Sequence, residues 1–261
     1  MTILIFFGIL INLFQATPVY ASDPPLLDAT SVATSSGSGT LTWSHTVTSA
    51  DNRLLLVSFF NRNVSVRALA NSVTYNGISL TRITTTAPLS NSYEELWYLV
   101  NPNSGTHNIS ISVSANGGSQ IYNAVASSWT NVDQNTPIGT FGSNSVGSGS
   151  AQTLSLSNTT TKDIVVDGVI TNNGATISHA GTTVTVVTSI GSSFNAYANS
   201  TPGVAGTTTI GFTPSKYSDN NIVAVVVHPF SNTYAISGNV FNDFNSNGVK
   251  DVGEIGFENV T

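Results

Sequence analysis

The sequence predicts an all-β protein whose main part is a large antiparallel β-sandwich of the jelly-roll-like kind. Short segments in which apolar and polar residues alternate recur along the chain, as in strands that bury one face. Turn-forming Gly, Asn, Asp and Pro residues separate these segments. Because no segment keeps an apolar period of 3.6 residues over three turns, we expect about a dozen strands packed as two sheets.

The strands follow from the pattern in chain order. Residues 40–47 alternate strictly and place Leu41 and Trp43 on one face. Residues 54–60 are almost continuously apolar, which favours a central strand buried on both faces. Residues 73–80 predict a hairpin, because Asn76-Gly77 suits a type I′ turn. Further strands are expected at residues 96–100, 109–113, 121–129, 164–170, 184–187 and 222–227.

The first 21 residues have the features of a secretory signal peptide. The apolar run at residues 3–11, extended to Phe14, has the length of a signal-peptide core and is too short to span a bilayer. Val19 and Ala21 form a cleavage signal before Ser22. No Lys or Arg precedes the run, so an uncleaved anchor is the alternative. We expect a secreted or cell-surface protein without a membrane span after cleavage.

The rest of the chain divides into a sandwich domain at residues 22–231 and the start of another β-repeat at residues 232–261. The linker between them fits best near residues 229–233. The Gly/Ser-rich segment at residues 142–150 is expected to be a loop inside the sandwich, because strands resume on both sides with similar composition.

The composition restricts the function further. Charged residues make up 8% of the chain, the formal net charge is −6, and no basic cluster is present, which argues against a nucleic-acid partner. There is no cysteine, so a secreted chain must be held by its core and by bound ions. Abundant Ser, Thr, Asn and Gly with alternating Val and Ile are typical of extracellular β-modules.

The stretch DFNSNGVKDVGE at residues 243–254 fits the calcium-loop pattern D-x-[DN]-x-[DN]-G-x5-E at every defined position. Gly248 stands where such a loop needs positive φ. The flanking residues show short β patterns in place of helices. Calcium prefers oxygen ligands, and the predicted ligands are Asp243, Asn245, Asn247, Asp251 and Glu254 through their side chains and Val249 through its carbonyl.

Residues 236–260, ISGNVFNDFNSNGVKDVGEIGFENV, resemble the start of the B domain of serine-aspartate-repeat surface proteins, a calcium-binding module of bacterial adhesins. The resemblance implies that a first strand leads into the calcium loop and that later strands complete a β-sandwich. Only the N-terminal fragment of such a repeat is present in this sequence.

A second resemblance covers the sandwich domain. The segments RLLLVSFF, SVTYNGISLTRI, ELWYLVNPNSGTHNISISV and AVASSWTNVDQNTPIGT resemble a secreted bacterial module that recurs in multidomain surface proteins. The resemblance implies a jelly-roll-like fold and an extracellular location, and it transfers no site residues.

The sequence offers few alternatives in which the protein is an enzyme. Glu94 and Glu95 are neighbours on a strand and point to opposite faces, so they do not form an acid/base pair with each other. Asp167 interrupts an apolar strand; a β-bulge at Asp167-Gly168 is expected, and a second metal site is the alternative. No zinc spacing or nucleophile elbow is present, although a triad assembled from distant residues stays open.

We therefore expect a non-enzymatic surface or secreted module with an adhesive or structural role and a calcium-stabilised stalk repeat. Its partner would be a surface protein or polysaccharide of a host or neighbouring cell. The alternative is a carbohydrate-binding module of a larger glycan-active enzyme. Aromatic residues are expected mainly in the core, although they could instead line a sugar-stacking groove: Tyr75, Tyr93, Trp97, Tyr122, Trp129, Tyr197 and Tyr217.

Overall fold

The structure is a computed structural model, and it describes residues 23–36, 39–63, 69–87, 92–114, 120–147, 150–179, 182–188, 194–231 and 241–256. Over these residues the protein is all-β, with 68% strand and no helix, so the predicted all-β sandwich is confirmed. No helix long and apolar enough to cross a membrane occurs in this part of the chain. The predicted signal peptide lies outside the described residues.

The chain has two compact units. One is Ser22–Ser231, which holds all the named strands. The other contains Asn232–Thr261, of which residues 241–256 are described.

The first half of the large unit, residues 26–130, contains nine named strands. Its inner sheet has the order β1-β9-β3-β7-β6, and its outer sheet has the order β2-β8-β4-β5. The bounds are β1 Leu26–Ser36, β2 Thr40–Val47, β3 Leu54–Asn63, β4 Ala70–Tyr75, β5 Ile78–Ser79, β6 Thr81–Thr85, β7 Ser92–Val100, β8 Gly105–Val113 and β9 Gln120–Thr130.

The second half, residues 138–227, contains eight named strands. Its inner sheet has the order β10-β17-β12-β15-β14, and its outer sheet has the order β11-β16-β13. The bounds are β10 Ile138–Gly147, β11 Gln152–Thr159, β12 Ile164–Asn172, β13 Ile177–His179, β14 Thr182–Thr188, β15 Phe194–Pro202, β16 Gly206–Pro214 and β17 Asp219–Val227.

The two halves repeat one topology. Each inner sheet is antiparallel. The strand orders of the two halves correspond position by position under one matching of strands. In this matching β1 to β4 correspond to β10 to β13, and β6 to β9 correspond to β14 to β17. The register agrees as well. In the first half, Leu54 at the start of β3 pairs with Val100 of β7 and Trp129 of β9. In the second half, Ile164 at the start of β12 pairs with Pro202 of β15 and Val227 of β17. Each partner is the last or the second-last residue of its strand. The large unit is therefore a tandem duplication of one sandwich.

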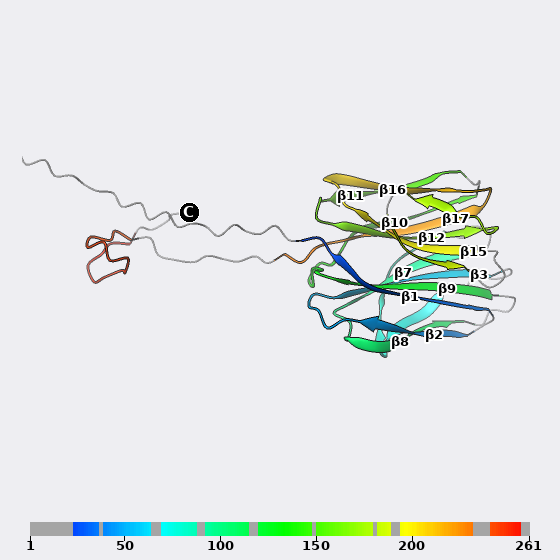
Figure 1. The fold of residues 1–261 in the computed structure, drawn as a ribbon, viewed down its shortest axis with the longest axis horizontal. Helices are drawn as coiled ribbons and strands as arrows, with labels where there is room; N and C mark the ends of the chain where they lie inside the picture. Colours follow the sequence, from blue (N-terminus) through cyan, green and yellow to red (C-terminus); the bar gives the residue numbers. More distant parts are fainter. Residues whose placement is uncertain are drawn as a thin grey trace, which may run out of the picture. The chain divides into compact units, whose positions relative to one another are not determined.

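The four sheets stack as layers, with the two inner sheets facing each other (Figure 1). One core lies between the inner and outer sheets of the first half and contains Val57 and Ile111. A matching core in the second half contains Val165 and Ile210. Two further clusters, which include Leu56 and Phe60, join the inner sheets of the two halves. The inner strands are apolar on both faces because both faces are covered.

The number of sheets differs from the prediction. The alternation along the strands predicted two sheets, and the structure has four, because periodicity reports which face is buried but not which sheet covers it. The predicted strands at residues 40–47 and 54–60 are confirmed, as is the hairpin, in which Asn76 and Gly77 have φ of 50° and 76°.

The predicted loop at residues 142–150 is wrong over most of its length, because β10 extends to Gly147. This strand lies at the edge of its sheet, paired only with β17. Its small residues suit close packing: a Cβ at Gly142 would lie 3.3 Å from Leu154 Cδ1. Gly142 therefore lies close against Leu154 of the neighbouring sheet within this half-buried edge strand.

Gly168 lies at the contact between the two inner sheets. A Cβ at this position would lie 2.2 Å from Glu94 Oε1 and 3.0 Å from Ser58 Oγ. Since Glu94 is fully buried, its carboxyl group has little room to move away. The approach of the two halves therefore depends on glycine at this point.

Replacing Gly168 with alanine should lower the free energy of unfolding by about 1–3 kcal/mol, the usual cost of overpacking a core. Chemical denaturation of the wild type and Gly168→Ala measures the change. The control is Ser58→Ala, at the corresponding position of the first half, which removes an atom from the same contact. An unchanged midpoint for Gly168→Ala would contradict this packing.

Candidate functional site

The predicted calcium loop is closed at its base by backbone pairing. Phe241 forms an antiparallel bridge with Gly256, and Asn242 N–H donates to the carbonyl of Ile255 over 3.0 Å. Within the loop, Gly248 has a φ of 76°, as predicted for the sharp turn, and Ser246 and Gly253 also have positive φ. The backbone therefore doubles back on itself and brings the two ends of the loop together.

The first three oxygen-bearing side chains turn into the loop. Asp243 accepts hydrogen bonds from the N–H groups of Asn247 and Gly248, at 3.2 and 2.7 Å. Asn245 Oδ1 accepts from Asn247 N–H at 3.1 Å, and Asn247 Oδ1 accepts from Val249 N–H at 2.7 Å. These bonds hold the oxygens of loop positions one, three and five on the inside of the turn.

The remaining two side chains close the network. Asp251 Oδ2 accepts from both amide groups, Asn245 Nδ2 at 2.6 Å and Asn247 Nδ2 at 2.7 Å. Glu254 accepts from Phe244 N–H at 3.0 Å and from Asp251 N–H at 2.8 Å. The five side chains predicted as ligands therefore belong to one hydrogen-bonded network.

The donor set of this loop fits a hard cation by chemical type. It offers three carboxylates and two amide oxygens, and calcium takes six to eight oxygen ligands. Apart from Asp251 Oδ2, which accepts from both amides, each of these oxygens has a second lone pair beside the one that accepts an N–H. In the described residues, no three His, Cys, Asp or Glu side chains lie close enough together to hold a metal ion. In this arrangement the two amides stand beside Asp251, so cation binding requires their Nδ2 groups to turn away.

Two comparisons with known proteins identified no relative of this chain. The chain matches no protein-family model, and a search of curated proteins returns no match. Its similarity to the calcium-binding B domain and to the secreted sandwich module therefore stays a prediction from the residues quoted above.

The acidic pair Glu94–Glu95 is separated by the sheet, as parity predicted. Glu94 faces the second half, where burial and then Asp167 raise its pKa well above the ordinary value. Glu95 faces the outer sheet of the first half and accepts from Ala70 N–H at 2.7 Å, with Arg82 3.4 Å away. The two carboxyls therefore cannot act on one substrate.

One serine–histidine contact comes together from distant strands. Ser31 Oγ lies 2.8 Å from His45 Nδ1 and accepts the indole N–H of Trp43 at 2.9 Å. Desolvation lowers the pKa of His45 to about 4, so the imidazole is a weak base at neutral pH. This contact therefore has poor properties for activating a nucleophile.

The aromatic residues lie mainly in the core, as expected. Six of the seven named above are at most 7% exposed, and only Tyr217 stands out at 66%. An aromatic row for stacking on a sugar is therefore not formed by these residues.

Asp167 lies in a buried polar cluster, and the predicted β-bulge is wrong. Its strand pairs in unbroken register on both sides. Asp167 is fully buried, accepts from Asn199 Nδ2 at 2.9 Å and has His179 Nε2 3.2 Å from its other oxygen, in an orientation that does not make a hydrogen bond. A strand covered on both faces leaves its carboxylate no route to solvent, so tertiary partners replace the expected bulge.

Gln152 adds a further polar group between the same two sheets. It is 2% exposed, and neither its Oε1 nor its Nε2 has a hydrogen-bond partner. An unpaired buried amide costs about 1–3 kcal/mol, so its presence requires an explanation. We call Gln152, Asp167, His179 and Asn199 the polar cluster.

Sequence reasoning missed the polar cluster because it missed the duplication. The signal that could have found it is the repeated start of β8 and β16, GTHNI at residues 105–109 and GTTTI at residues 206–210. Aligning the halves on this repeat would have set polar residues of the second half against apolar residues of the first.

Proposed function

We propose that the protein is a non-enzymatic secreted or cell-surface module with an adhesive or structural role, and that residues 243–254 bind calcium. The observation that carries this proposal is the network in which every oxygen-bearing side chain of the loop pattern takes part. The apolar leader and the abundance of Ser, Thr, Asn and Gly with few charged residues support an extracellular location.

In this proposal calcium stiffens the C-terminal repeat. The cation would neutralise Asp243, Asp251 and Glu254 and fix the loop between Phe241 and Gly256. Three carboxylates and two neutral amides favour a weak site, with a Kd of about 10⁻⁴–10⁻³ M, as in extracellular modules. Such a site fills outside a cell and stays mostly empty in the cytosol. A ligand that binds only the folded form stabilises it, by about 1–2 kcal/mol at roughly 5 mM calcium.

Isothermal titration of the full chain with calcium tests the site. We expect binding in the stated range, and at least about tenfold weaker binding for Glu254→Gln, because this change removes the carboxylate at the closing position. The matched control is Asp133→Asn, which changes a turn carboxylate in the other unit and should leave calcium affinity unchanged. A wild-type calcium affinity in Glu254→Gln would contradict the assignment of the loop.

The alternative, a carbohydrate-binding module of a larger enzyme, is not favoured in the form of an aromatic stacking platform. Six of the seven aromatic residues considered for that platform are buried, and Tyr217 is the exposed one. A glycan ligand would therefore need a site based on hydrogen bonding.

A further inference from the structure

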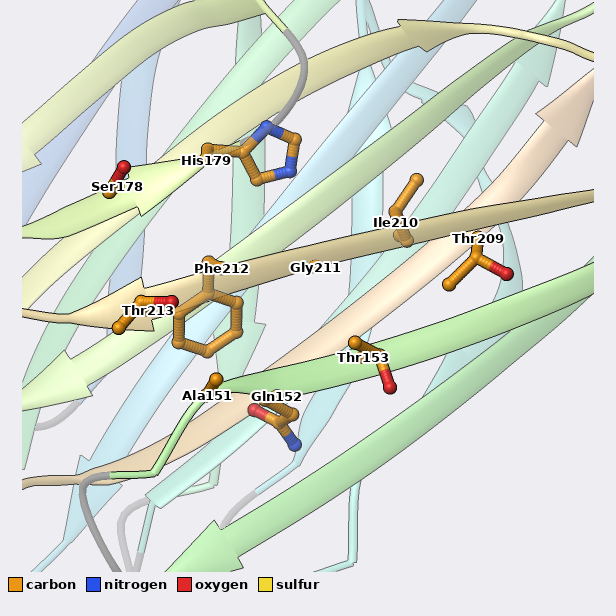
Figure 2. A pocket seen from close by; sticks show the side chains of 10 residues that line it. All are labelled: Ala151, Gln152, Thr153, Ser178, His179, Thr209, Ile210, Gly211, Phe212 and Thr213. Carbon is orange, nitrogen blue, oxygen red and sulfur yellow. The ribbon is translucent and has the colours of Figure 1, made fainter.

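The hollow over β11, β16 and β13 does not present its lining residues on one face. These residues, labelled in Figure 2, divide into two sets. Gln152 and Phe212 are 2% and 3% exposed and face the inner sheet, whereas Thr153 and Thr209 are exposed on the opposite face of the same strands. One ligand cannot reach both sets. The described groups that combine into a reactive site lie instead in the loop at residues 243–254.

Asn247 and Gly248 form an Asn-Gly pair in this loop, and both are exposed. Such a pair can react with itself, because the backbone nitrogen of the glycine can attack the side-chain carbonyl carbon of the asparagine and close a succinimide ring. Glycine favours this step since it has no side chain to block the approach. At Gly248 φ is 76°, and outside its chain neighbours no heavy atom lies within 4 Å of the place of a Cβ. The pair is therefore sterically open.

A carboxylate stands at the attacking nitrogen. Gly248 N–H donates to Asp243 Oδ2 over 2.7 Å, a short bond to a charged acceptor. The nitrogen must lose this proton as the new N–C bond forms. Asp243 is therefore placed as the general base for the step.

A hydrogen-bond donor stands at the carbonyl group that is attacked. Val249 N–H donates to Asn247 Oδ1 over 2.7 Å, which is the bond of an Asx turn. This bond folds the asparagine side chain back along the following peptide and draws electron density toward Oδ1. Negative charge gathers on this oxygen when the nitrogen adds to the carbon, so the same N–H stabilises the intermediate, as the donors of an oxyanion hole do.

The other Asn-Gly pairs of the described residues lack this base. Asn76-Gly77 forms the turn between β4 and β5, and Asn173-Gly174 follows β12. In the part of the chain that the structure describes, no carboxylate accepts from the N–H of Gly77 or Gly174. The two pairs therefore serve as internal references for the same reaction without a general base.

We propose that Asn247-Gly248 is a self-modification site, at which Asn247 is converted to an acidic residue. Gly248 N bonds to Asn247 Cγ while Asp243 accepts its proton, and the Cγ–Nδ2 bond breaks as Nδ2 takes up a proton and leaves as ammonia. Water then opens the succinimide at either carbonyl and gives aspartate or isoaspartate. One water is consumed and one ammonia is released, and no other reactant takes part.

The product changes the charge of the loop at its fifth position. Aspartate keeps the backbone and adds a fourth carboxylate, whereas isoaspartate lengthens the backbone and displaces the side chain. The self-modification does not depend on calcium, but its consequence rests on the proposed calcium function of residues 243–254. Because calcium affinity in such loops rises with the number of charged ligands, Asn247→Asp should bind calcium several-fold more tightly than the wild type in isothermal titration.

Incubation of the full chain at neutral pH with a calcium chelator, followed by peptide mapping with mass spectrometry, measures the reaction. We expect aspartate and isoaspartate to accumulate at Asn247 several-fold faster than at Asn76 and Asn173. Asp243→Asn should slow the reaction at Asn247 about tenfold or more, because general-base assistance is at least of that size. The matched control is Asp133→Asn, which changes a turn carboxylate in the other unit and should leave the rate unchanged.

The wild type in concentrated urea keeps the test decisive if Asp243→Asn disrupts the loop. Unfolding separates Asp243 and Val249 from the pair, so the reaction at Asn247 should slow to the rate at Asn76 and Asn173. A loop that only shields the pair predicts the opposite sign, with faster reaction in urea and in Asp243→Asn. Either acceleration, or equal rates at the three asparagines in the folded chain, would overturn the proposal. The rates are measured without calcium, so failure of calcium binding and failure of the self-modification are distinguishable.

Discussion

Replacing Asp167 with valine should lower the free energy of unfolding of the large unit by about 3 kcal/mol. The carboxylate is fully buried and is the acceptor for Asn199 Nδ2. It also lies against His179, whose side chain is 2% exposed. Removing it takes away the acceptor of Asn199 Nδ2 and sets an apolar side chain against the buried His179 ring. Urea denaturation followed by tryptophan fluorescence measures the loss.

The double change Asp167→Val with His179→Val should recover part of that stability, because it replaces the buried His179 while Asn199 Nδ2 still lacks its acceptor. The first half carries Val57 and Val73 at these two positions and packs them in its core. Replacing both members of a buried polar pair by apolar residues is often neutral or stabilising, whereas removing one member is costly. Equal losses in the single and double variants would contradict this coupling between Asp167 and His179.

Replacing Glu94 with glutamine should make the protein less sensitive to rising pH. Glu94 is fully buried, neither of its carboxyl oxygens has a hydrogen-bond partner, and it packs against Gly168. Burial, and then the charge of Asp167, raise the pKa of Glu94 well above the ordinary value of 4.5. The folded state therefore keeps the proton where the unfolded chain has lost it.

The sign of the pH effect follows from this proton. Above about pH 4.5 the folded state binds more protons than the unfolded state, so stability falls as pH rises, by up to about 1.4 kcal/mol per pH unit, until the folded-state pKa is passed. Glu94→Gln removes this slope and should be the more stable chain at high pH. Thermal melts at a series of pH values above 4.5 measure it.

Glu95→Gln is the matched control for the pH experiment. It makes the same change on the other face of β7, where burial also raises the pKa of Glu95 but Ala70 N–H and Arg82 oppose the shift. Its effect on the pH slope should therefore be smaller. A full slope remaining in Glu94→Gln would show that another group carries the proton.

The strands that the sequence predicted well are those whose pattern reports burial directly. Residues 40–47 bury alternate positions because one face of β2 meets the core, and residues 54–60 are almost continuously apolar because β3 has a sheet on each face. The hairpin at Asn76-Gly77 was predictable because positive φ at both positions is a local requirement.

Strands of the second half were harder to predict because their composition is less regular. β10 is rich in Gly and Ser and is still a strand, since an edge position and close packing against Leu154 accept small residues. β16 begins with a glycine and three consecutive threonines, a weak signal in a chain that is rich in threonine throughout. Local propensity cannot distinguish such strands from loops, because tertiary pairing stabilises them.

The candidate calcium loop could be predicted from sequence because its requirements are local. Five oxygen-bearing residues and a glycine within twelve positions determine which atoms can meet, and the structure joins all five in one network. The polar cluster required the tertiary structure. Gln152, Asp167, His179 and Asn199 belong to four strands in two sheets, and each is unremarkable in its own segment.

The sequence by itself determined the all-β class, the alternation of the strands and the loop at residues 243–254, because each depends on neighbours in the chain. Only the tertiary structure decided the number of sheets, the duplication and the position of Glu94 between the halves. The physical reason is that strand periodicity records that a face is buried, whereas the partner that covers it is chosen by contacts between residues far apart in the chain.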